Sequence, residues 1–361
     1  MKYIEEYRDR DLIMKLADHI RQSAVGKYSF MEVCGGHTSA IHRFGIPSLL
    51  PPGIDLISGP GCPVCVTSSD FIDRAVSYSK KENVIIATFG DLIRVPGSSS
   101  SLEKERSEGA DIRIVFSGLE ALNIARSNPE KMIIFPGIGF ETTAPGTAVT
   151  VKQAKEAGLN NFLVLSTHKV MPPVMDAIVR EGIRINGFIC PGHVATITGS
   201  GVFGFLPEKY NLGCVIAGFE PSDLLQSILM LLRQVNRKSP VVEIQYTRAV
   251  TLTGNAIAQR HLSDVFEFTD AEWRGFGTIP DSGLQLKKEF ENFDAAKRLP
   301  VTISQHKDNP SCICGDILRG LKKPYHCSLF RKVCTPENPV GACMVSAEGT
   351  CNTFFKYIPD E

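Results

Sequence analysis

Cysteine is concentrated near the end of this chain. Of its eleven cysteines, six lie within the final 50 residues. The six are Cys312, Cys314, Cys327, Cys334, Cys343 and Cys351. Thiolates bind zinc and iron–sulfur clusters, and a four-iron cluster needs four of them. The surrounding segment has few strong helix or strand patterns, so we expect a bound metal to help order it.

The spacing of these cysteines bears on which metal they bind. Cys312, Cys327, Cys334 and Cys351 are separated by successive gaps of 14, 6 and 16 residues. Zinc fingers and ribbons favour two close pairs, so the wide gaps count against zinc. The gaps also differ from the common ferredoxin runs. We favour an iron–sulfur cluster, with zinc or a set of reduced structural cysteines as the alternatives.

A separate C-x-x-C pair, Cys62 and Cys65, follows the sequence Gly-Pro-Gly. This spacing suits a redox-active dithiol, two ligands to one metal, or half of a zinc site. A four-cysteine zinc site needs a second close pair, and none lies nearby in the sequence. We favour the redox-active dithiol, while metal ligation and a purely structural pair are the alternatives.

Cys34 ends an apolar run and is followed by two glycines, His37 and Thr38. A thiolate near a helix N-terminus has a lowered pKa and is a good metal ligand. The two glycines clear space around the sulfur, which packing alone would not require. The alternative is a small buried residue in a tight turn.

The elements that position these residues alternate between short apolar runs and amphipathic stretches, which is the pattern of parallel α/β sheets. The predicted strands are Phe30–Val33, Ile54–Ile57, Val84–Thr88, Ile112–Phe116, Met132–Phe135, Phe162–Leu165, Gly187–Ile189 and Cys214–Ala217. Residues 11–22 and the segment after Glu220 have helical spacing of apolar residues.

We divide the eight strands into two sets of four. The predicted architecture is α/β, with two doubly wound parallel-sheet domains, at 28–120 and 121–240, facing a cleft. Residues 241–361 lose the alternating pattern, so we expect them to form, with residues 1–27, a third, irregular iron–sulfur domain.

In open parallel sheets, ligands bind outside the carboxyl ends of the strands. The unusual motifs occupy those ends: CGGHT (34–38), GPGCPVC (59–65), FGD (89–91), GFETT (139–143), STH (166–168), CPGH (190–193) and GFE (218–220). We therefore expect a cleft lined with Cys, His and Glu. Glu141 and His193, from two of these loops, join Cys34, His37 and the Cys62/Cys65 pair as predicted catalytic residues.

Composition excludes several other classes of function. Lys plus Arg and Asp plus Glu both total 39, so the formal net charge is zero and nucleic acid is an unexpected partner. No apolar run approaches the roughly 18–20 residues that span a bilayer. The N-terminus lacks the apolar core of a signal peptide. We expect a cytoplasmic protein, where most thiols stay reduced.

Taken together and in order, these motifs resemble the HypD family of NiFe-hydrogenase maturation proteins. CGGHT at 34–38, GPGCPVC at 59–65, GFETT at 139–143, PGHV at 191–194 and the tail from Cys312 to Cys351 carry the resemblance over nearly the whole chain. The family assembles the iron centre, Fe(CN)2CO, that is later inserted into the hydrogenase. Its members act with a small HypC-type chaperone and receive cyanide from a HypE-type partner.

The resemblance implies roles for individual residues. Cys34 would ligate the iron under construction, the chaperone would supply a second thiolate, and His37 would lie beside Cys34. Cys62 and Cys65 would form a thiol/disulfide pair that receives electrons from a 4Fe–4S cluster. We choose Cys312, Cys327, Cys334 and Cys351 as the cluster ligands, with an exchange between Cys312 and Cys314 as the main alternative.

Two functions of other classes use the same residues. An iron–sulfur disulfide reductase acting on a protein thiol would need the dithiol and the cluster. A zinc-stapled α/β binding module would need neither redox role. The resemblance favours an assembly scaffold with redox activity over a free-standing enzyme.

Overall fold

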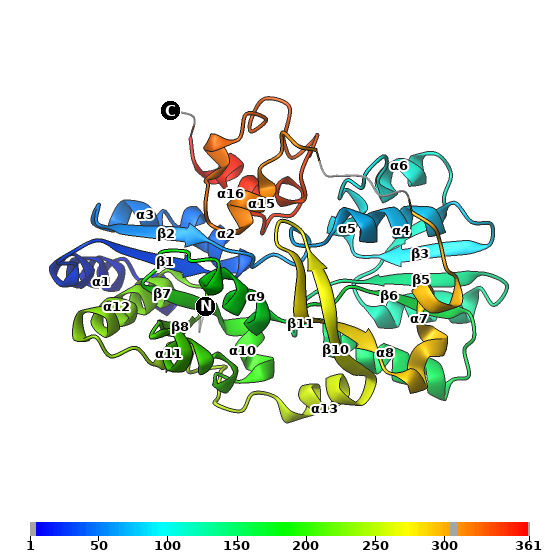
Figure 1. Ribbon diagram of the computed structural model, residues 1–361, viewed down its shortest axis with the longest axis horizontal. Coiled ribbons are helices and arrows are strands. Elements are labelled where there is room, and N and C mark those ends of the chain that lie inside the picture. The colour runs from blue at the N-terminus through cyan, green and yellow to red at the C-terminus, as the bar shows by residue number, and fades with distance from the viewer. Residues whose placement is uncertain (1–4, 304–308, 360–361) are drawn as a thin grey trace.

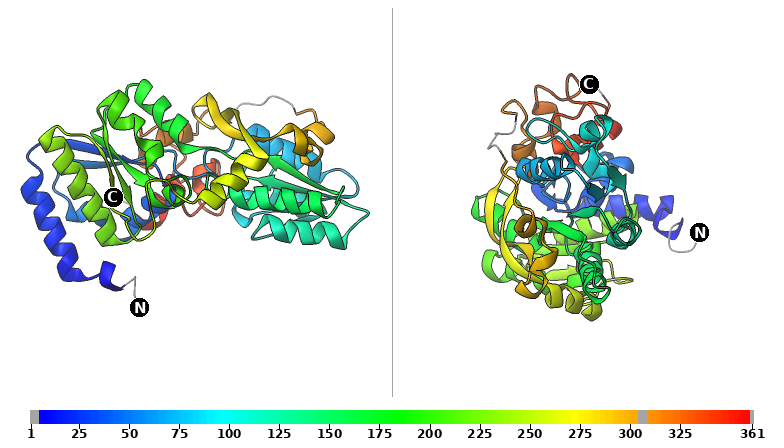
Figure 2. Two further views of the ribbon diagram at one scale, coloured as in Figure 1. Left: turned by 90° about the horizontal axis from the view of Figure 1, so that it is seen from below. Right: turned by 90° about the vertical axis from the view of Figure 1, so that its right-hand side faces the viewer.

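A computed structural model describes residues 5–303 and 309–359. Two parallel sheets dominate it and lie at opposite ends of an elongated molecule (Figures 1 and 2). The α/β class with two parallel sheets is therefore confirmed. Sheet A has the order β2-β1-β7-β8-β9 and sheet B the order β4-β3-β5-β6. The strands are β1 Tyr28–Glu32, β2 Ile54–Ser58, β3 Val84–Thr88, β4 Ile112–Ile114, β5 Met132–Gly137, β6 Phe162–Ser166, β7 Gly187–Pro191, β8 Gly213–Ala217 and β9 Val242–Ile244.

The strands do not divide between the sheets at residue 120, as the predicted domains 28–120 and 121–240 require. The chain lays down β1 and β2 in sheet A, builds all of sheet B with β3 to β6, and returns to sheet A with β7 to β9. Within sheet A, β1 pairs with β7 in parallel, joining Phe30 to Gly187. Buried parallel strands have the same apolar pattern in either sheet, so the pattern locates strands without assigning them to a sheet.

Helices cover these sheets at positions close to the predicted ones. The helices of four or more residues up to sheet A's last strand are α1 Arg10–Ser23, α2 Gly35–Arg43, α3 Ile46–Leu49, α4 Ser69–Ser79, α5 Gly90–Ile93, α6 Leu102–Ser107, α7 Gly118–Ser127, α8 Ala144–Glu156, α9 Met171–Arg180, α10 Gly192–Thr198, α11 Phe205–Tyr210 and α12 Pro221–Arg237. Helix α12 begins with Pro at its first position and buries Leu224, Leu225, Ile228 and Leu232 against sheet A.

The predicted association of residues 1–27 with residues 241–361 differs from the packing observed. Helix α1 lies along α12, on the layer of sheet A (Figure 1). It buries Ala17 and Ile20 there, which are part of its apolar stripe. Tyr7, ahead of the helix, is the point at which this region meets Arg248.

Residues 241–361 contain more regular structure than the sequence predicts. Strands β10 (Phe266–Trp273) and β11 (Gly277–Leu286) form an antiparallel hairpin that reaches from the layer of sheet B toward the C-terminal segment (Figure 1). The remaining helices are α13 Ala256–Val265, α14 Ala295–Arg298, α15 Cys314–Leu318 and α16 Thr350–Tyr357. The chain between α15 and α16 carries three of the six C-terminal cysteines, Cys327, Cys334 and Cys343.

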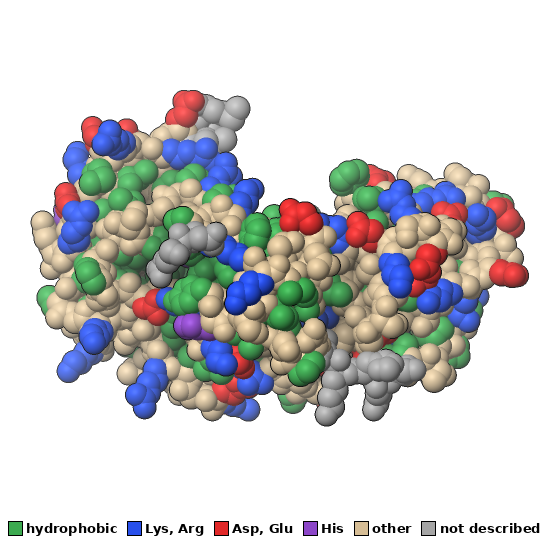
Figure 3. All heavy atoms as spheres, turned by 90° about the horizontal axis from the view of Figure 1, so that it is seen from above, with side chains coloured by type: hydrophobic (Ala, Val, Ile, Leu, Met, Phe, Trp, Pro, Cys, Tyr) green, Lys and Arg blue, Asp and Glu red, His purple; other side chains and the backbone are tan. Residues whose placement is uncertain are grey.

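The surface of the described residues carries charges of both signs. On the face shown in Figure 3, basic and acidic side chains are interspersed. None of the helices in the described ranges is long and apolar enough to span a membrane.

Candidate functional site

Cys34 lies where strand β1 ends and helix α2 begins, as predicted. It occupies the N-cap position of α2, and its side chain is only 1% exposed. The backbone groups of His37 and Gly36, in the first turn of the helix, act to lower the pKa of its thiol. Burial nevertheless raises the pKa of the Cys34 thiol well above its ordinary value, and the nearby carboxyl group of Glu348 adds to this. The thiol is therefore neutral unless a cation replaces its proton.

Glycine lets the loops around Cys34 approach one another closely. A Cβ added to Gly61 would lie 2.1 Å from the Cys34 backbone nitrogen, and one added to Gly35 would lie 2.6 Å from Cβ of Glu348 and 3.2 Å from Cβ of Cys62. The Gly35 N–H donates to the Gly61 carbonyl at 2.9 Å. The two cysteine loops at the ends of β1 and β2 and the C-terminal segment thus meet at one point.

Two histidines flank the ring of Phe219 beside Cys34. The ring of His193 stacks on Phe219 with centroids 5.2 Å apart, and that of His37 lies at 4.7 Å. His193, and not the predicted His37, contacts the sulfur, with Nδ1 3.7 Å from Cys34 Sγ. His37 Nε2 instead lies 3.3 Å from the Ala217 carbonyl. Burial lowers the pKa of His37 to about 3 and also lowers that of His193, so both rings are neutral near pH 7.

Two residues of this site, Glu32 and Phe219, were not predicted from the sequence. Glu32 is buried, accepts a hydrogen bond from the Cys34 N–H at 3.0 Å, and is also bonded to the Thr38 hydroxyl. Burial raises the pKa of Glu32 to about 8. An acidic residue inside an otherwise apolar strand was the available signal for it. Phe219 was noted only as part of the GFE motif, because nothing local shows that its ring meets two histidines.

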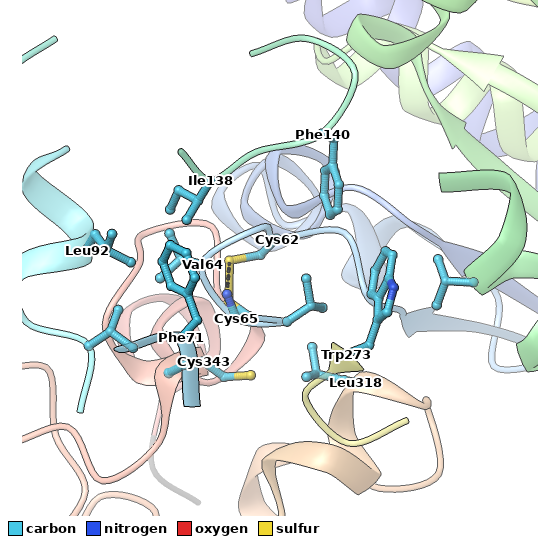
Figure 4. Close-up of a cluster of buried hydrophobic side chains, with 14 of the residues drawn as sticks. Cys62, Val64, Cys65, Phe71, Leu92, Ile138, Phe140, Trp273, Leu318 and Cys343 are labelled. Atoms are coloured by element: carbon cyan, nitrogen blue, oxygen red, sulfur yellow. Dashed lines mark hydrogen bonds between the residues drawn. A yellow bond between two sulfur atoms is a disulfide. The ribbon is translucent and has the colours of Figure 1, made fainter. Parts of the chain in front are cut away.

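Cys62 and Cys65 form a disulfide. The two residues are 3% and 0% exposed, and the Cys65 N–H donates to Cys62 Sγ at 3.2 Å. Figure 4 shows Ile138 and Phe140, from the loop after β5, on one side of this pair and Cys343 on another. The disulfide is therefore enclosed where loops from both sheets and the C-terminal segment come together.

Glu141 lies in the GFETT loop, next to Phe140. Its Oε1 accepts a hydrogen bond from the Met171 N–H at 2.9 Å, and its buried Oε2 has no hydrogen-bond partner among the described residues. Burial raises the pKa of Glu141 to about 7. The structure thus gives this predicted residue a perturbed carboxyl group, and Met171 is the partner observed for it.

The six C-terminal cysteines converge on one cavity. Its walls are Cys312, Cys314, Cys327, Cys334, Cys343 and Cys351, together with apolar residues that include Ile317, Leu329, Phe330 and Met344. The Cys312 and Cys343 side chains neighbour the Cys314 thiol in this cavity. Six thiols and an apolar wall, from residues spread over 40 positions of chain (312–351), match the donor set of an iron–sulfur cluster.

Among the described residues, no three Cys, His, Asp or Glu side chains are placed so that they could hold one ion. A multi-iron cluster places iron and sulfide atoms between its thiolates, so its ligands stand farther apart than those of one zinc ion. The six cysteines that line the cavity offer the four thiolates that a cluster needs, and the geometry does not choose four ligands from the six.

Known proteins of similar sequence belong to the family that the motifs resemble. A family model named HypD, described as "Hydrogenase formation hypA family", matches residues 11–358. The chain is 46% identical to the hydrogenase maturation factor HypD2 of Bradyrhizobium diazoefficiens, with 99% of this chain and 97% of that protein covered. It is also 46% identical to the maturation factor HypD of Azotobacter vinelandii, over 99% and 97% of the two chains.

An archaeal protein is equally similar. The chain is 46% identical to a putative hydrogenase expression/formation protein of Methanocaldococcus jannaschii, covering 97% of this chain and 98% of that one. Identity at this level over whole chains, together with the family match, means that the chain belongs to the HypD family of hydrogenase maturation factors.

Proposed function

We propose that this maturation factor is the scaffold on which the Fe(CN)2CO centre is assembled, with Cys34 as the protein's ligand to the iron. One observation carries the proposal: a buried thiol stands at a helix N-terminus and contacts a neutral imidazole. Soft thiolates suit low-spin, electron-rich iron. A small HypC-type chaperone supplies the second thiolate and a HypE-type protein supplies the cyanide.

The residues around Cys34 prepare it to exchange a proton for iron. Burial keeps the sulfur protonated until the metal arrives. His193 is neutral, and its Nδ1 at 3.7 Å is placed to take the proton when the thiolate forms. The N–H groups of Gly36 and His37 then stabilise the thiolate. Glu32, through the Cys34 N–H, fixes the backbone from which the sulfur projects.

The cysteine cavity and the disulfide supply the redox part of the proposal. Cys312, Cys327, Cys334 and Cys351 would hold a 4Fe–4S cluster, which when bound would deliver electrons for reduction of the Cys62–Cys65 disulfide. A Cβ added to Gly35 would lie 3.2 Å from Cβ of Cys62, so the thiols of the pair would form beside the Cys34 loop. Assembly of the iron centre and thiol redox chemistry would therefore take place side by side.

An iron–sulfur disulfide reductase acting on a protein thiol is the second candidate. The same disulfide and cysteine cavity favour it. Enclosure counts against it, because residues 3% and 0% exposed are closed to attack by a thiol on another protein. We therefore propose that the disulfide acts together with Cys34 and not on a thiol of another protein.

The deciding experiment is anaerobic purification of the chain together with a HypC-type chaperone. Infrared bands of iron-bound cyanide and carbon monoxide, with iron and sulfide contents that match a cluster plus one further iron, are expected. Thiol-reductase turnover without such bands would favour the second candidate. A colourless protein with stoichiometric zinc would favour a zinc-stapled binding module.

A further inference from the structure

The tip of the β10–β11 hairpin joins parts of the chain that the proposed redox chemistry must keep together. The tip, residues 273–277, runs from the last residue of β10 to the first of β11 and reaches away from sheet B to the C-terminal segment (Figure 1). Trp273 is fully buried there, and its ring stacks on Phe140 at 6.0 Å. Figure 4 shows Trp273 and Leu318 on the same side of the Cys62–Cys65 pair. The tip is thus part of the core that encloses the disulfide.

Arg274, at this tip, is bonded to the end of the disulfide loop. Its backbone N–H donates to the Val66 carbonyl at 2.9 Å, and its Nε donates to the Thr67 carbonyl at 2.9 Å. The loop itself is closed by the Val66 N–H, which donates to the Cys62 carbonyl at 3.2 Å. Two hydrogen bonds from one residue therefore hold the chain immediately after Cys65.

The same tip contacts the start of the cysteine-rich segment, residues 312–351. Gly275 has a φ of +86°, and a Cβ added to it would lie 2.5 Å from Cα of Gly315. Arg274, Gly275 and Gly315 line one hollow together with Cys312 and Cys314. Because both backbones are glycine at the contact, the hairpin packs directly against the chain that carries two of the cysteines.

The burial of Arg274 indicates that this contact is part of the packed core. The residue is 7% exposed, and taking a guanidinium group out of water costs free energy unless its donors are bonded. Arginine offers a planar set of donors on a long stem, so one side chain can bond a carbonyl of one loop while it lies against another segment. The assigned maturation role does not by itself require an arginine here.

We propose that Arg274 is a positioning residue for the Cys62–Cys65 pair. Its hydrogen bond to the Thr67 carbonyl holds the loop in the geometry of the disulfide and keeps it against the cysteine-rich segment. The inference rests on the proposed redox role of that pair. Closeness of two thiols raises their effective concentration and so favours the disulfide. Loss of the Arg274 bond therefore loosens the loop and shifts the equilibrium toward the dithiol.

The test is a thiol–disulfide equilibrium on the full-length chain purified without oxygen. Reduced and oxidised dithiothreitol are mixed at defined ratios, so that the protein disulfide breaks, the reagent's disulfide forms, and two protons pass from the reagent to Cys62 and Cys65. Alkylation and mass spectrometry of the peptide that contains both cysteines give the reduced fraction. Arg274→Met keeps the apolar stem and the backbone N–H bond to Val66 and removes the side-chain donors.

Arg94→Met is the matched control. Arg94 also bonds backbone carbonyls of the cysteine-rich segment, those of Pro336 at 3.0 Å and Val345 at 3.2 Å. These hydrogen bonds of Arg94, within the part of the chain that the structure describes, do not reach Val66 or Thr67. If the loss of any arginine from this core shifted the thiol–disulfide equilibrium, the Arg274 and Arg94 variants would therefore show the same shift.

We expect Arg274→Met to move the equilibrium about tenfold toward the dithiol, equal to about 30 mV for a two-electron couple. Arg94→Met should leave it unchanged. Arg274→Lys, which keeps the charge on a single ammonium group, should shift it in the same direction by about threefold, and it carries the test if Arg274→Met does not fold. An unchanged equilibrium, or equal shifts in the Arg274 and Arg94 variants, would overturn the inference. Failure of the iron-centre role is seen separately, as missing infrared bands in the unsubstituted chain.

Discussion

The sulfur of Cys34 lies 3.7 Å from Nδ1 of His193, although 159 residues separate the two in the sequence. Strands β1 and β7 pair in parallel, so the loops that follow them emerge at the same edge of sheet A. The pairing of β1 with β7 therefore brings the Cys34 thiol next to the His193 imidazole. A site of this kind exists only once the chain has returned from building sheet B.

Cys34→Ala should abolish the assembly of the iron centre and leave the cluster in place. The proposed cluster ligands belong to residues 312–351, and Cys34 belongs to the β1–α2 loop. We expect the infrared bands of cyanide and carbon monoxide to vanish from the complex with the chaperone, while the visible absorbance persists. Cys214→Ala, at a fully buried cysteine inside β8, is the control and should keep both signals. Bleaching of the cluster by Cys34→Ala would contradict the assignment.

Alanine variants of the six C-terminal cysteines should fall into two groups. Because a 4Fe–4S cluster takes four thiolates, the absorbance should be lost on substitution of Cys312, Cys327, Cys334 or Cys351 and retained on substitution of Cys314 or Cys343. Iron and sulfide contents measured under anaerobic conditions provide the check. If Cys314→Ala bleaches the protein and Cys312→Ala does not, these two neighbours exchange roles. Six variants that all keep the cluster would remove it from this cavity.

Gly61→Ala should destabilise the protein and displace Cys34. The added Cβ would lie 2.1 Å from the Cys34 nitrogen and 2.2 Å from its Cα, and both are backbone atoms that cannot rotate away. We expect the free energy of unfolding to fall by about 3 kcal/mol in urea titrations. Gly146→Ala is the control, since no atom lies within 4 Å of its added Cβ in helix α8. There the free energy of unfolding should rise by about 0.5–1 kcal/mol.

Glu141→Gln should reduce the dependence of stability on pH. The pKa of Glu141 is raised from 4.5 in the free residue to about 7 by burial, so between these values the folded state binds a proton that the unfolded state has lost. The stability that this carboxyl contributes is present below its unfolded pKa and is lost as pH rises toward about 7. Glutamine stays neutral throughout and removes this loss.

The measurement for Glu141 is urea unfolding at about pH 5 and about pH 7. The unsubstituted chain should lose about 2 kcal/mol more than Glu141→Gln across this interval, at about 1.4 kcal/mol per pKa unit. Glu103→Gln, on the exposed side of helix α6, should behave like the unsubstituted chain. Equal pH profiles for Glu141→Gln and the unsubstituted chain would show that Glu141 is ionised in the folded state.

Local patterns in the sequence located most of the fold's parts. Each of the eight predicted strands is present to within a few residues, because strands buried on both faces are runs of Val, Ile, Leu and Phe between helical periods. The β10–β11 hairpin was missed, since exposed residues such as Glu267 and Phe268 interrupt its alternation. The motifs in the strand-end loops likewise pointed to Cys34, the Cys62–Cys65 pair and the C-terminal cysteines.

The sequence by itself determined the α/β class, the positions of the strands, the strand-end loops and the cysteine-rich segment, because these depend on periodicity and residue type along short stretches of chain. Only the tertiary structure decided that β7 joins β1, that His193 rather than His37 meets Cys34, and that Arg274 bonds the disulfide loop. Each of these contacts joins residues more than 150 positions apart. Such pairs are fixed by the order of strands in a sheet and by glycine-to-glycine packing, which no local pattern encodes.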